Sequence, residues 1–248
     1  MDSGSTERVA ETLQPGRLNR ALIRLFMKRA SVVGFEPVAE GFRLITVESP
    51  EFQGIRWIPG QKIQVALGSA FVSRTFTPIE WDAKAGRTRI LAYAHGASPG
   101  SEWIRSMKAG DECDIFGPRA SLDVSGVAGP VVVFGDETSI GLGYSILRQN
   151  PNRAVHCLLE VGSVETSRSV LSRLDLSATE LFERRWDTTH LQEIEQRLPA
   201  FAAAGATFVL TGKASSIQQV RRALKALDIP ASRLASKAYW APGKTGLD

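Results

Sequence analysis

Residues 74–78 read Arg74-Thr75-Phe76-Thr77-Pro78, and residues 95–103 read His95-Gly96-Ala97-Ser98-Pro99-Gly100-Ser101-Glu102-Trp103. The first run offers a guanidinium fork for phosphate, a flat aromatic ring and a Thr hydroxyl that can donate a hydrogen bond. The second offers backbone N–H groups in a loop of small residues that a phosphate can approach closely. One run on a strand and the other opening a helix predict a small β-barrel that binds a flavin and its pyrophosphate.

Composition narrows the class of protein. The chain has 248 residues and 43% hydrophobic content, which predicts two domains with full cores. Cys113 and Cys157 lie far apart without a nearby His or Cys, so we expect neither a zinc cluster nor a disulfide framework, and a reduced cytoplasm suits them. The net charge of +4 comes from scattered residues and fits a small anionic ligand better than a nucleic acid. We expect no bound metal, no membrane span and no signal peptide.

The texture of the sequence predicts three segments. Residues 1–29 are a polar leader followed by a short basic amphipathic helix at 17–29, which either packs on the protein or lies on a membrane surface. Residues 30–125 contain short β-like runs separated by Gly and Pro turns, interrupted by one short helix at 102–107, and predict an antiparallel β-barrel. Residues 126–248 predict an α/β domain with a C-terminal tail.

In the C-terminal segment, strand-like and helical patterns alternate, which predicts a parallel sheet with crossover helices. The strands are expected at 131–134, 154–161, 207–211 and 236–240, and the helices at 138–149, 191–198 and 215–227. Ligands of such sheets bind beyond the carboxyl ends of the strands. This half is therefore expected to bind a nucleotide.

The expected carboxyl edge carries Gly135-Asp136-Glu137-Thr138, which is not the three-glycine dinucleotide fingerprint. Its two carboxylates either cap the following helix or repel a pyrophosphate placed there. Basic residues such as Lys213 or Arg168 would then assist a nicotinamide cofactor. Glu160 at the end of the second strand either accepts a ribose hydroxyl, which favours NADH, or is a solvated carboxylate.

With these motifs, the chain resembles the siderophore-interacting proteins, which are ferric-siderophore reductases of the ferredoxin–NADP reductase superfamily. The matching segments are Arg74 to Thr77, His95 to Trp103, Gly117-Pro118-Arg119, Gly135 to Thr138, and Tyr239-Trp240 with Gly243. Phe76 stands where the family usually has Tyr, so the stacking face is kept and a hydroxyl is lost.

The resemblance implies an FAD-dependent enzyme that passes electrons from NADH, NADPH or ferredoxin to iron(III) held by a siderophore. Reductases with another acceptor and non-catalytic siderophore binders share the same pattern and remain open. No side chain is expected to act as a catalytic residue, because the chemistry belongs to the flavin. The expected FAD-binding residues are Arg74, Thr75, Phe76, Thr77, His95, Gly96, Ala97, Gly100, Ser101, Trp103 and Thr138. The expected substrate residues are Lys62, Arg119, Lys237, Tyr239, Trp240 and Lys244.

Overall fold

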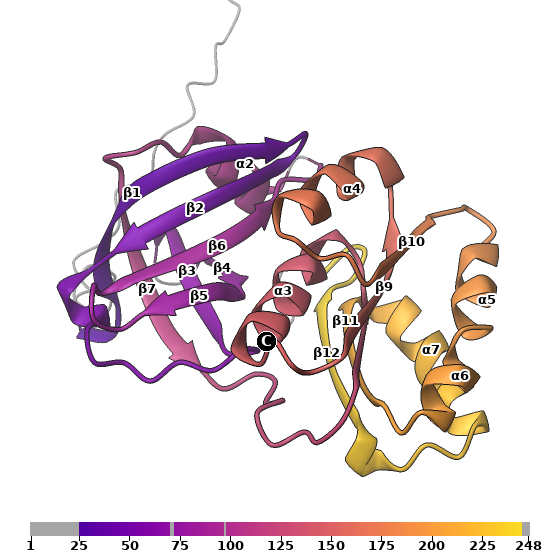
Figure 1. Cartoon of the computed structure of the whole chain (residues 1–248). Coiled ribbons are helices and arrows are strands. Elements are labelled where there is room, and N and C mark those ends of the chain that lie inside the picture. The colour runs from indigo at the N-terminus through magenta and orange to yellow at the C-terminus, as the bar shows by residue number, and fades with distance from the viewer. Residues whose placement is uncertain (1–24, 70–71, 97, 245–248) are drawn as a thin grey trace, which may run out of the picture.

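The computed structural model describes residues 25–69, 72–96 and 98–244. Figure 1 shows an antiparallel sheet in the N-terminal half beside a parallel sheet in the C-terminal half, with helices of the C-terminal half at their junction. Ala97, the predicted polar leader and residues 17–24 of the predicted helix lie outside the described residues. Among the helices that are described, none is long and apolar enough to cross a membrane.

The antiparallel sheet is curved like a barrel but is not closed. Its strands are β1 (Lys28–Ala39), β2 (Phe42–Glu48), β3 (Lys62–Ser69), β4 (Val72–Phe76), β5 (Pro78–Asp82), β6 (Arg87–Tyr93) and β7 (Glu112–Arg119), in the order β4-β3-β7-β1-β2-β6-β5. The edge strands β4 and β5 follow each other in the chain with only Thr77 between them. They meet at this corner without pairing, and Pro78 at the start of β5 has no N–H with which to pair. The 3₁₀ turn η1 (Pro50–Phe52) and helix α2 (Pro99–Ser106) complete this half.

The N-terminal helix predicted to reach Arg29 is too long. Lys28 and Arg29 already belong to β1, where they pair with Ile115 and Asp114 of β7. The Arg29 guanidinium bonds both Glu112 and Asp114, so charges on the neighbouring strand hold these residues extended.

The parallel sheet confirms the predicted α/β half. Its strands are β8 (Val131–Gly135), β9 (Val155–Val161), β10 (Thr179–Glu183), β11 (Thr207–Lys213) and β12 (Leu234–Trp240), in the order β10-β9-β8-β11-β12. Its helices are η2 (Glu137–Ser139), α3 (Ile140–Gln149), α4 (Val164–Arg173), α5 (Thr189–Glu195), α6 (Leu198–Ala203), α7 (Ala214–Ala226) and η3 (Ala231–Arg233). The order of strands reverses between β8 and β11, which is where sheets of this kind bind ligands.

Two elements of this half were not predicted from the sequence, and the prediction of one helix was wrong. The missed elements are α4 and β10. The single helix predicted at 191–198 is two helices, α5 and α6. Pro199 lies in the first turn of α6, where its missing N–H costs nothing, whereas within one continuous helix it would remove a backbone hydrogen bond.

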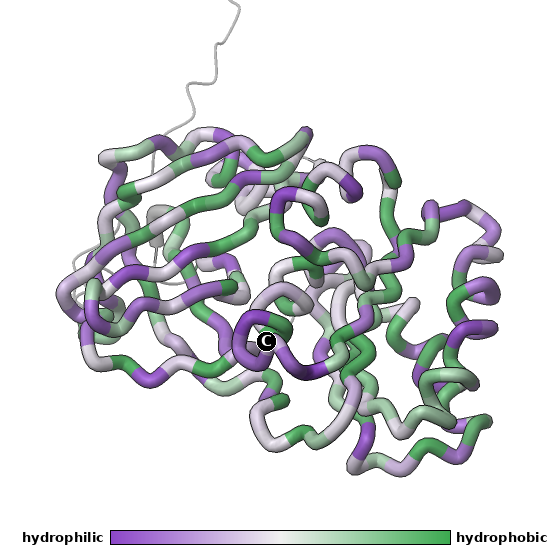
Figure 2. The backbone as a smooth tube through the Cα atoms, in the orientation of Figure 1, coloured by the Kyte–Doolittle hydropathy of each residue, from purple (hydrophilic) through white to green (hydrophobic). Residues whose placement is uncertain are grey.

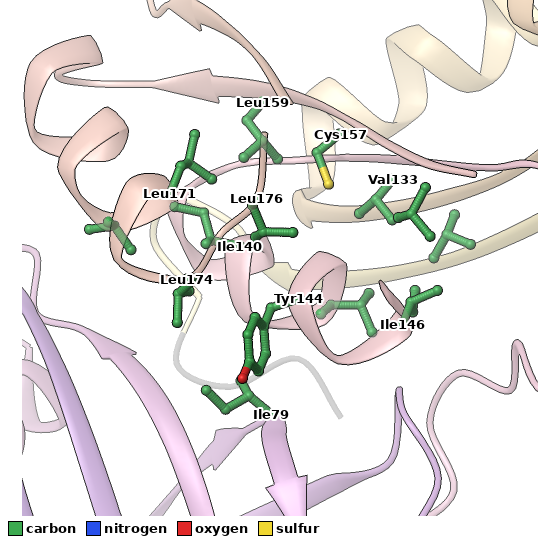
Figure 3. Packing of buried hydrophobic residues seen from close by; sticks show 14 of the residues in the cluster. Ile79, Val133, Ile140, Tyr144, Ile146, Cys157, Leu159, Leu171, Leu174 and Leu176 are labelled. Atoms are coloured by element: carbon green, nitrogen blue, oxygen red, sulfur yellow. The ribbon is translucent and has the colours of Figure 1, made fainter. Parts of the chain in front are cut away.

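One apolar cluster joins the two sheets. It contains Phe42, Leu44 and Ile79 from the antiparallel sheet together with buried residues of β8, β9, α3 and α4. Figure 3 shows Ile79 of β5 and Tyr144 of α3 facing each other across the junction. In Figure 2 hydrophobic residues run along the strands of both sheets, whereas the outer helices alternate between polar and apolar.

A polar contact supports this junction. The Tyr144 hydroxyl donates to Glu80 of β5, and Arg89 of β6 bonds the other oxygen of Glu80 at 3.0 Å. Burial alone would raise the pKa of the Glu80 carboxyl, but these two hydrogen bonds outweigh it and the net pKa is lowered. Glu80 is therefore held ionised at the contact between the halves.

Because Ile79 is fully buried in the shared cluster, truncating it should weaken both halves together. We expect Ile79→Ala to lower the free energy of unfolding by about 2–5 kcal/mol and Ile79→Val by about 0.5–1.5 kcal/mol. Urea unfolding followed by circular dichroism measures both. Val33→Ala, on an exposed side chain of β1, is the matched control and should stay within about 0.5 kcal/mol of the parent. An Ile79→Ala protein as stable as the control would contradict a shared core.

Candidate functional site

A cavity of about 490 Å³, here called the central cavity, lies between the two sheets. The antiparallel half contributes β4, the ends of β3 and β6, and the start of α2, while the parallel half contributes Thr138, α3 and the end of β12. Its lining includes the basic side chains Lys62, Arg74, Lys237 and Lys244 and the rings of Phe76, Tyr93, His95, Tyr239 and Trp240. No carboxylate is among the described residues that line it. The cavity thus combines flat apolar walls with positive charge.

Arg74 lies against the first turn of α2. A Cβ added to Gly100 would come within 2.9 Å of the Arg74 Cγ, so glycine at this position lets the side chain cross the helix start. Ser98 caps α2 by accepting from the Ser101 N–H at 3.2 Å, and the Ser101 hydroxyl donates to the His95 carbonyl at 2.7 Å. These bonds fix the loop around the helix end. A guanidinium and the positive end of a helix dipole therefore face the same part of the cavity, which suits a phosphate.

Two contacts fix the walls of the central cavity, one with a residue outside the lining and one between the two halves of the molecule. Trp103 of α2 packs against Phe76 with ring centroids 5.3 Å apart and is not itself among the lining residues. The Thr77 hydroxyl lies 3.4 Å from the Tyr239 hydroxyl, which links the β4–β5 corner to β12. Trp103 thus orients Phe76, and Thr77 ties the two halves together at the cavity.

The two acidic residues after β8 turn inward, which resolves the charge conflict that the sequence suggested. Asp136, fully buried, caps η2 by accepting from the Thr138 backbone at 2.9 Å and also accepts from the Trp240 indole N–H at 2.7 Å. Glu137 accepts from the Gly162 N–H at 2.7 Å and from Arg184 at 2.8 Å. Burial raises the pKa of the Asp136 carboxyl, and the hydrogen bonds from Thr138 and Trp240 partly offset this. The helix-capping interpretation is confirmed for Asp136.

A second cavity, of about 340 Å³ and here called the edge cavity, lies at the carboxyl ends of β9, β10 and β11. Its lining includes Arg185, the almost fully exposed indole of Trp186, and Lys213. The Lys213 ammonium makes no hydrogen bond or ion pair within the described part of the chain and lies 5.9 Å from the centre of the Trp240 ring. Glu160 also lines it, but this side chain is buried and bonds His190 Nε2 at 2.9 Å. The solvated-carboxylate interpretation of Glu160 is therefore wrong.

Most of the predicted cofactor and substrate residues come together at the central cavity. Those that line it are Lys62, Arg74, Thr75, Phe76, Thr77, His95, Gly100, Ser101, Thr138, Lys237, Tyr239, Trp240 and Lys244. Gly96 and Arg119 are not among the lining residues, and Arg119 instead bonds Gln64 at 2.6 Å and stacks over the Phe116 ring. Arg168 lies on α4 in a separate hollow, apart from Lys213.

Sequence reasoning missed several residues. Tyr93 ends β6, directly before the His95 loop, and the sequence predicted only that this segment contains short strands, not which side chains face the cavity. Arg184, Arg185 and Trp186 follow β10, a five-residue strand with only two apolar residues, Leu181 and Phe182, so its sequence gives little strand signal.

Two family models match consecutive parts of the chain. The model of the siderophore-interacting FAD-binding domain matches residues 61–122, and the model of the siderophore-interacting protein matches residues 128–243. The antiparallel sheet followed by a parallel one defines a fold of the ferredoxin reductase class. Within that class, the chain belongs to the siderophore-interacting protein family. No curated protein matches the sequence.

Solved structures share this fold at low sequence identity. The siderophore-interacting protein SipS from Aeromonas hydrophila is 21% identical with a TM-score of 0.71, covering 89% of this chain and 93% of that one. A siderophore utilization protein from T. fusca is 19% identical with a TM-score of 0.73, covering 90% and 95%. The ferredoxin-NADP+ reductase from Plasmodium falciparum is 12% identical with a TM-score of 0.69, covering 86% and 96%.

The tyrosines offer a test of how closed the junction is. Burial raises the pKa of the Tyr239 phenol to about 12, and burial likewise raises the pKa values of Tyr93 and Tyr144, which are the other tyrosines of the chain. Absorbance at 295 nm should therefore change little as the folded protein passes pH 10, whereas the unfolded chain titrates there. Because the folded state holds these protons more tightly, stability should fall as the pH rises from about 10 towards 12. A tyrosine that titrates at pH 10 in the folded protein would contradict this burial.

Proposed function

We propose that the protein is an FAD-dependent reductase that passes electrons from NADH or NADPH, through FAD, to iron(III) held by a siderophore. The observation that carries this proposal is the central cavity, which both halves of the molecule build and which pairs aromatic walls with basic side chains. The family to which the chain belongs supports the same conclusion.

The residues of the central cavity fit FAD. Basic side chains without a carboxylate among the described lining residues suit its pyrophosphate, and Arg74 beside α2 is the place where charge and helix dipole coincide. Phe76 and Tyr93 offer flat surfaces for the ring, and Thr77 offers a hydroxyl. When bound, FAD would accept two electrons from a hydride donor and release them one at a time. Reduction of iron(III) requires such single electrons.

The assignment of Arg74 to the pyrophosphate can be tested directly. Arg74→Ala removes a charge-assisted contact worth about 1.5–3 kcal/mol, so we expect FAD to bind roughly tenfold to a hundredfold more weakly. Fluorescence titration of FAD into cofactor-free protein measures the change. Arg87→Ala is the matched control, because Arg87 lies on β6 outside the central cavity and pairs with Glu48. Equal FAD affinity for Arg74→Ala and the parent would refute the assignment.

The edge cavity is the proposed entry for the adenosine end of NADH or NADPH. It lies at the carboxyl ends of β9, β10 and β11, where Lys213 offers positive charge to phosphates and Trp186 offers an exposed ring for a base. Arg185 adds a guanidinium that also pairs with Glu193. One oxygen of Glu160 is bonded to His190, and the other, Oε1, is buried without a hydrogen-bond partner among the described residues, so Glu160 remains our candidate acceptor for a ribose hydroxyl, which favours NADH. Arg168, the other basic residue predicted for this cofactor, does not line the edge cavity and lies in a separate hollow on α4, so we do not include it in the proposed site.

The siderophore is proposed to dock over the mouth of the central cavity. Lys237 belongs to β12, and the exposed Lys244 follows the turn after this strand. Both line the central cavity together with Tyr239 and Trp240. Their charges attract an anionic chelate and raise its encounter rate. Iron(III) binds hard oxygen ligands far more strongly than iron(II), so reduction lets the metal leave without any protein ligand. Arg119 does not belong to this group, because its guanidinium bonds Gln64 and stacks over the Phe116 ring.

One anaerobic experiment tests the function. The FAD-loaded protein should be bleached by NADH or NADPH and should regain its colour when an anionic ferric siderophore is added, with iron(II) captured by a chelating dye. Lys237→Gln/Lys244→Gln should slow the second step at low salt while sparing bleaching, and added salt should narrow the difference. Arg168→Gln/Lys225→Gln is the control with the same loss of two charges at exposed positions that line neither cavity.

A protein that is bleached but does not produce iron(II) would point to a reductase with another acceptor. A protein that binds the ferric siderophore without holding FAD would be a carrier. Either result contradicts the proposed function.

A further inference from the structure

Glu160 has one unsatisfied polar atom at the edge cavity. Its side chain lines this cavity at the end of β9, and both it and His190 are no more than 2% exposed. Oε2 of the carboxylate bonds His190 Nε2 at 2.9 Å, whereas Oε1 is buried without a hydrogen-bond partner among the described residues. A buried acceptor that lacks a donor is costly, so a ligand that brings a donor to this point is stabilised.

The backbone fixes where the proton of the His190 ring lies. The Arg185 backbone nitrogen is 3.1 Å from Nδ1, and because a backbone N–H can only donate, Nδ1 is the acceptor of this bond. The ring proton is therefore on Nε2, which donates to Glu160 Oε2. His190 thus occupies one oxygen of the carboxylate and leaves the other for a ligand.

The turn between β10 and α5 holds the His190 ring against Arg185. Thr188, directly before α5, has a φ of 61°, a left-handed conformation that is unfavourable for a β-branched residue. Asp187 accepts hydrogen bonds from the backbone N–H and the hydroxyl of Thr189, at 3.1 and 2.8 Å. A backbone in this conformation persists because its surroundings hold it, so the orientation of His190 is set before a ligand arrives.

The edge cavity also has an unsatisfied donor. Arg184, another lining residue, donates from its Nη2 to Glu137 and to the Glu160 carbonyl, but its Nε is buried without an acceptor among the described residues. A hydroxyl group both donates and accepts, whereas an ammonium only donates and a fully ionised phosphate only accepts. The unsatisfied atoms of Glu160 and Arg184 therefore match a hydroxyl better than either charged group.

We propose that His190 is the positioning residue that presents Glu160 Oε1 to the 2′-hydroxyl of an adenosine ribose, and that this arrangement selects NADH over NADPH. This assignment rests on the proposed function, which places the adenosine end of the donor in the edge cavity. In NADPH the same ribose oxygen carries a phosphate, which has no proton to donate and brings negative charge against the carboxylate. Lys213 attracts the pyrophosphate that both donors share, so it raises affinity without distinguishing them.

Nucleotide binding tests this assignment without any redox step. FAD-loaded protein is titrated calorimetrically with ADP and with 2′-deoxy-ADP, because FAD fills the central cavity and leaves the edge cavity for these probes. We expect the parent to bind 2′-deoxy-ADP roughly tenfold to a hundredfold more weakly than ADP, since loss of the hydroxyl leaves the carboxylate oxygen unpaired. 3′-Deoxy-ADP is the control ligand and should bind within about threefold of ADP. Equal affinities for ADP and 2′-deoxy-ADP would overturn the proposal.

Two substitutions of His190 separate positioning from packing. His190→Gln carries its amide N–H close to the place of Nε2 and should keep the preference for ADP over 2′-deoxy-ADP. His190→Asn is one methylene shorter, still accepts from the Arg185 N–H and does not reach Glu160, so the preference should fall to about threefold or less. Its affinity for 2′-deoxy-ADP should match the parent's, because this probe has no 2′-hydroxyl. Equal losses for both probes, or an unchanged preference, would overturn the role of His190.

Glu160→Gln tests the acceptor itself and does not depend on the folding of the His190 variants. It keeps the shape of the side chain and removes its charge, so it should also lower the preference for ADP over 2′-deoxy-ADP. His156→Asn is the matched control, because His156 lies on β9, packs against the Phe201 ring and does not line the edge cavity. A parent-like preference in Glu160→Gln would overturn the assignment of the acceptor.

Bleaching of the FAD-loaded protein by each donor gives the functional readout. We expect the parent to need roughly tenfold or more NADPH than NADH for its half-maximal rate, and His190→Asn to narrow this difference. A parent that uses both donors equally would overturn the proposal while leaving the reductase function intact. A protein that takes up no FAD, or gives no iron(II), would contradict the proposed function, and titration with ADP and 2′-deoxy-ADP would still decide the roles of Glu160 and His190.

Discussion

The apolar contact between the two sheets is the constraint on which the rest of the molecule depends. Ile79 of β5 and Tyr144 of α3 belong to a single buried cluster that runs from the antiparallel sheet through α3 into the parallel one. The central cavity has walls from both halves, so its shape is defined only while this contact holds. The bonds of Glu80 with Tyr144 and Arg89 add direction to a contact that hydrophobic burial alone would leave free to slide.

Charge is arranged around the cavity by turning acidic groups away from it. Asp136 and Glu137 follow the central strand β8 at its carboxyl end, where their charges would repel an anionic ligand. Both carboxylates instead accept hydrogen bonds from donors inside the parallel half. The side chains that line the cavity include basic and aromatic ones but, among the described residues, no carboxylate. Buried carboxylates satisfied by hydrogen bonds thus fix the local backbone without spoiling the positive field.

The sequence predicted the order of the two sheets and the segments that meet at the cavity, because Arg74 to Thr77 and the His95 loop carry local chemistry that spacing reveals. It did not predict the open barrel, since strand pairing at the edges depends on partners distant in the chain. Glu160 shows a further limit: its strand end was foreseen, but its bond to His190 comes from α5, an element whose position only the fold determines. Arg119 likewise was expected at the cavity and is instead committed to Gln64 of a neighbouring strand. The division of the chain at residue 125, a ferredoxin donor and a cytoplasmic location stay predictions.

The central claim about this protein is that the central cavity is its flavin site. A crystal structure of the protein grown with FAD tests this most directly. The account predicts the flavin ring between β4 and the Tyr239–Trp240 end of β12, with the pyrophosphate within hydrogen-bonding distance of Arg74 and the first turn of α2. A flavin bound elsewhere on the molecule, or a central cavity that holds only water at saturating FAD, would contradict it.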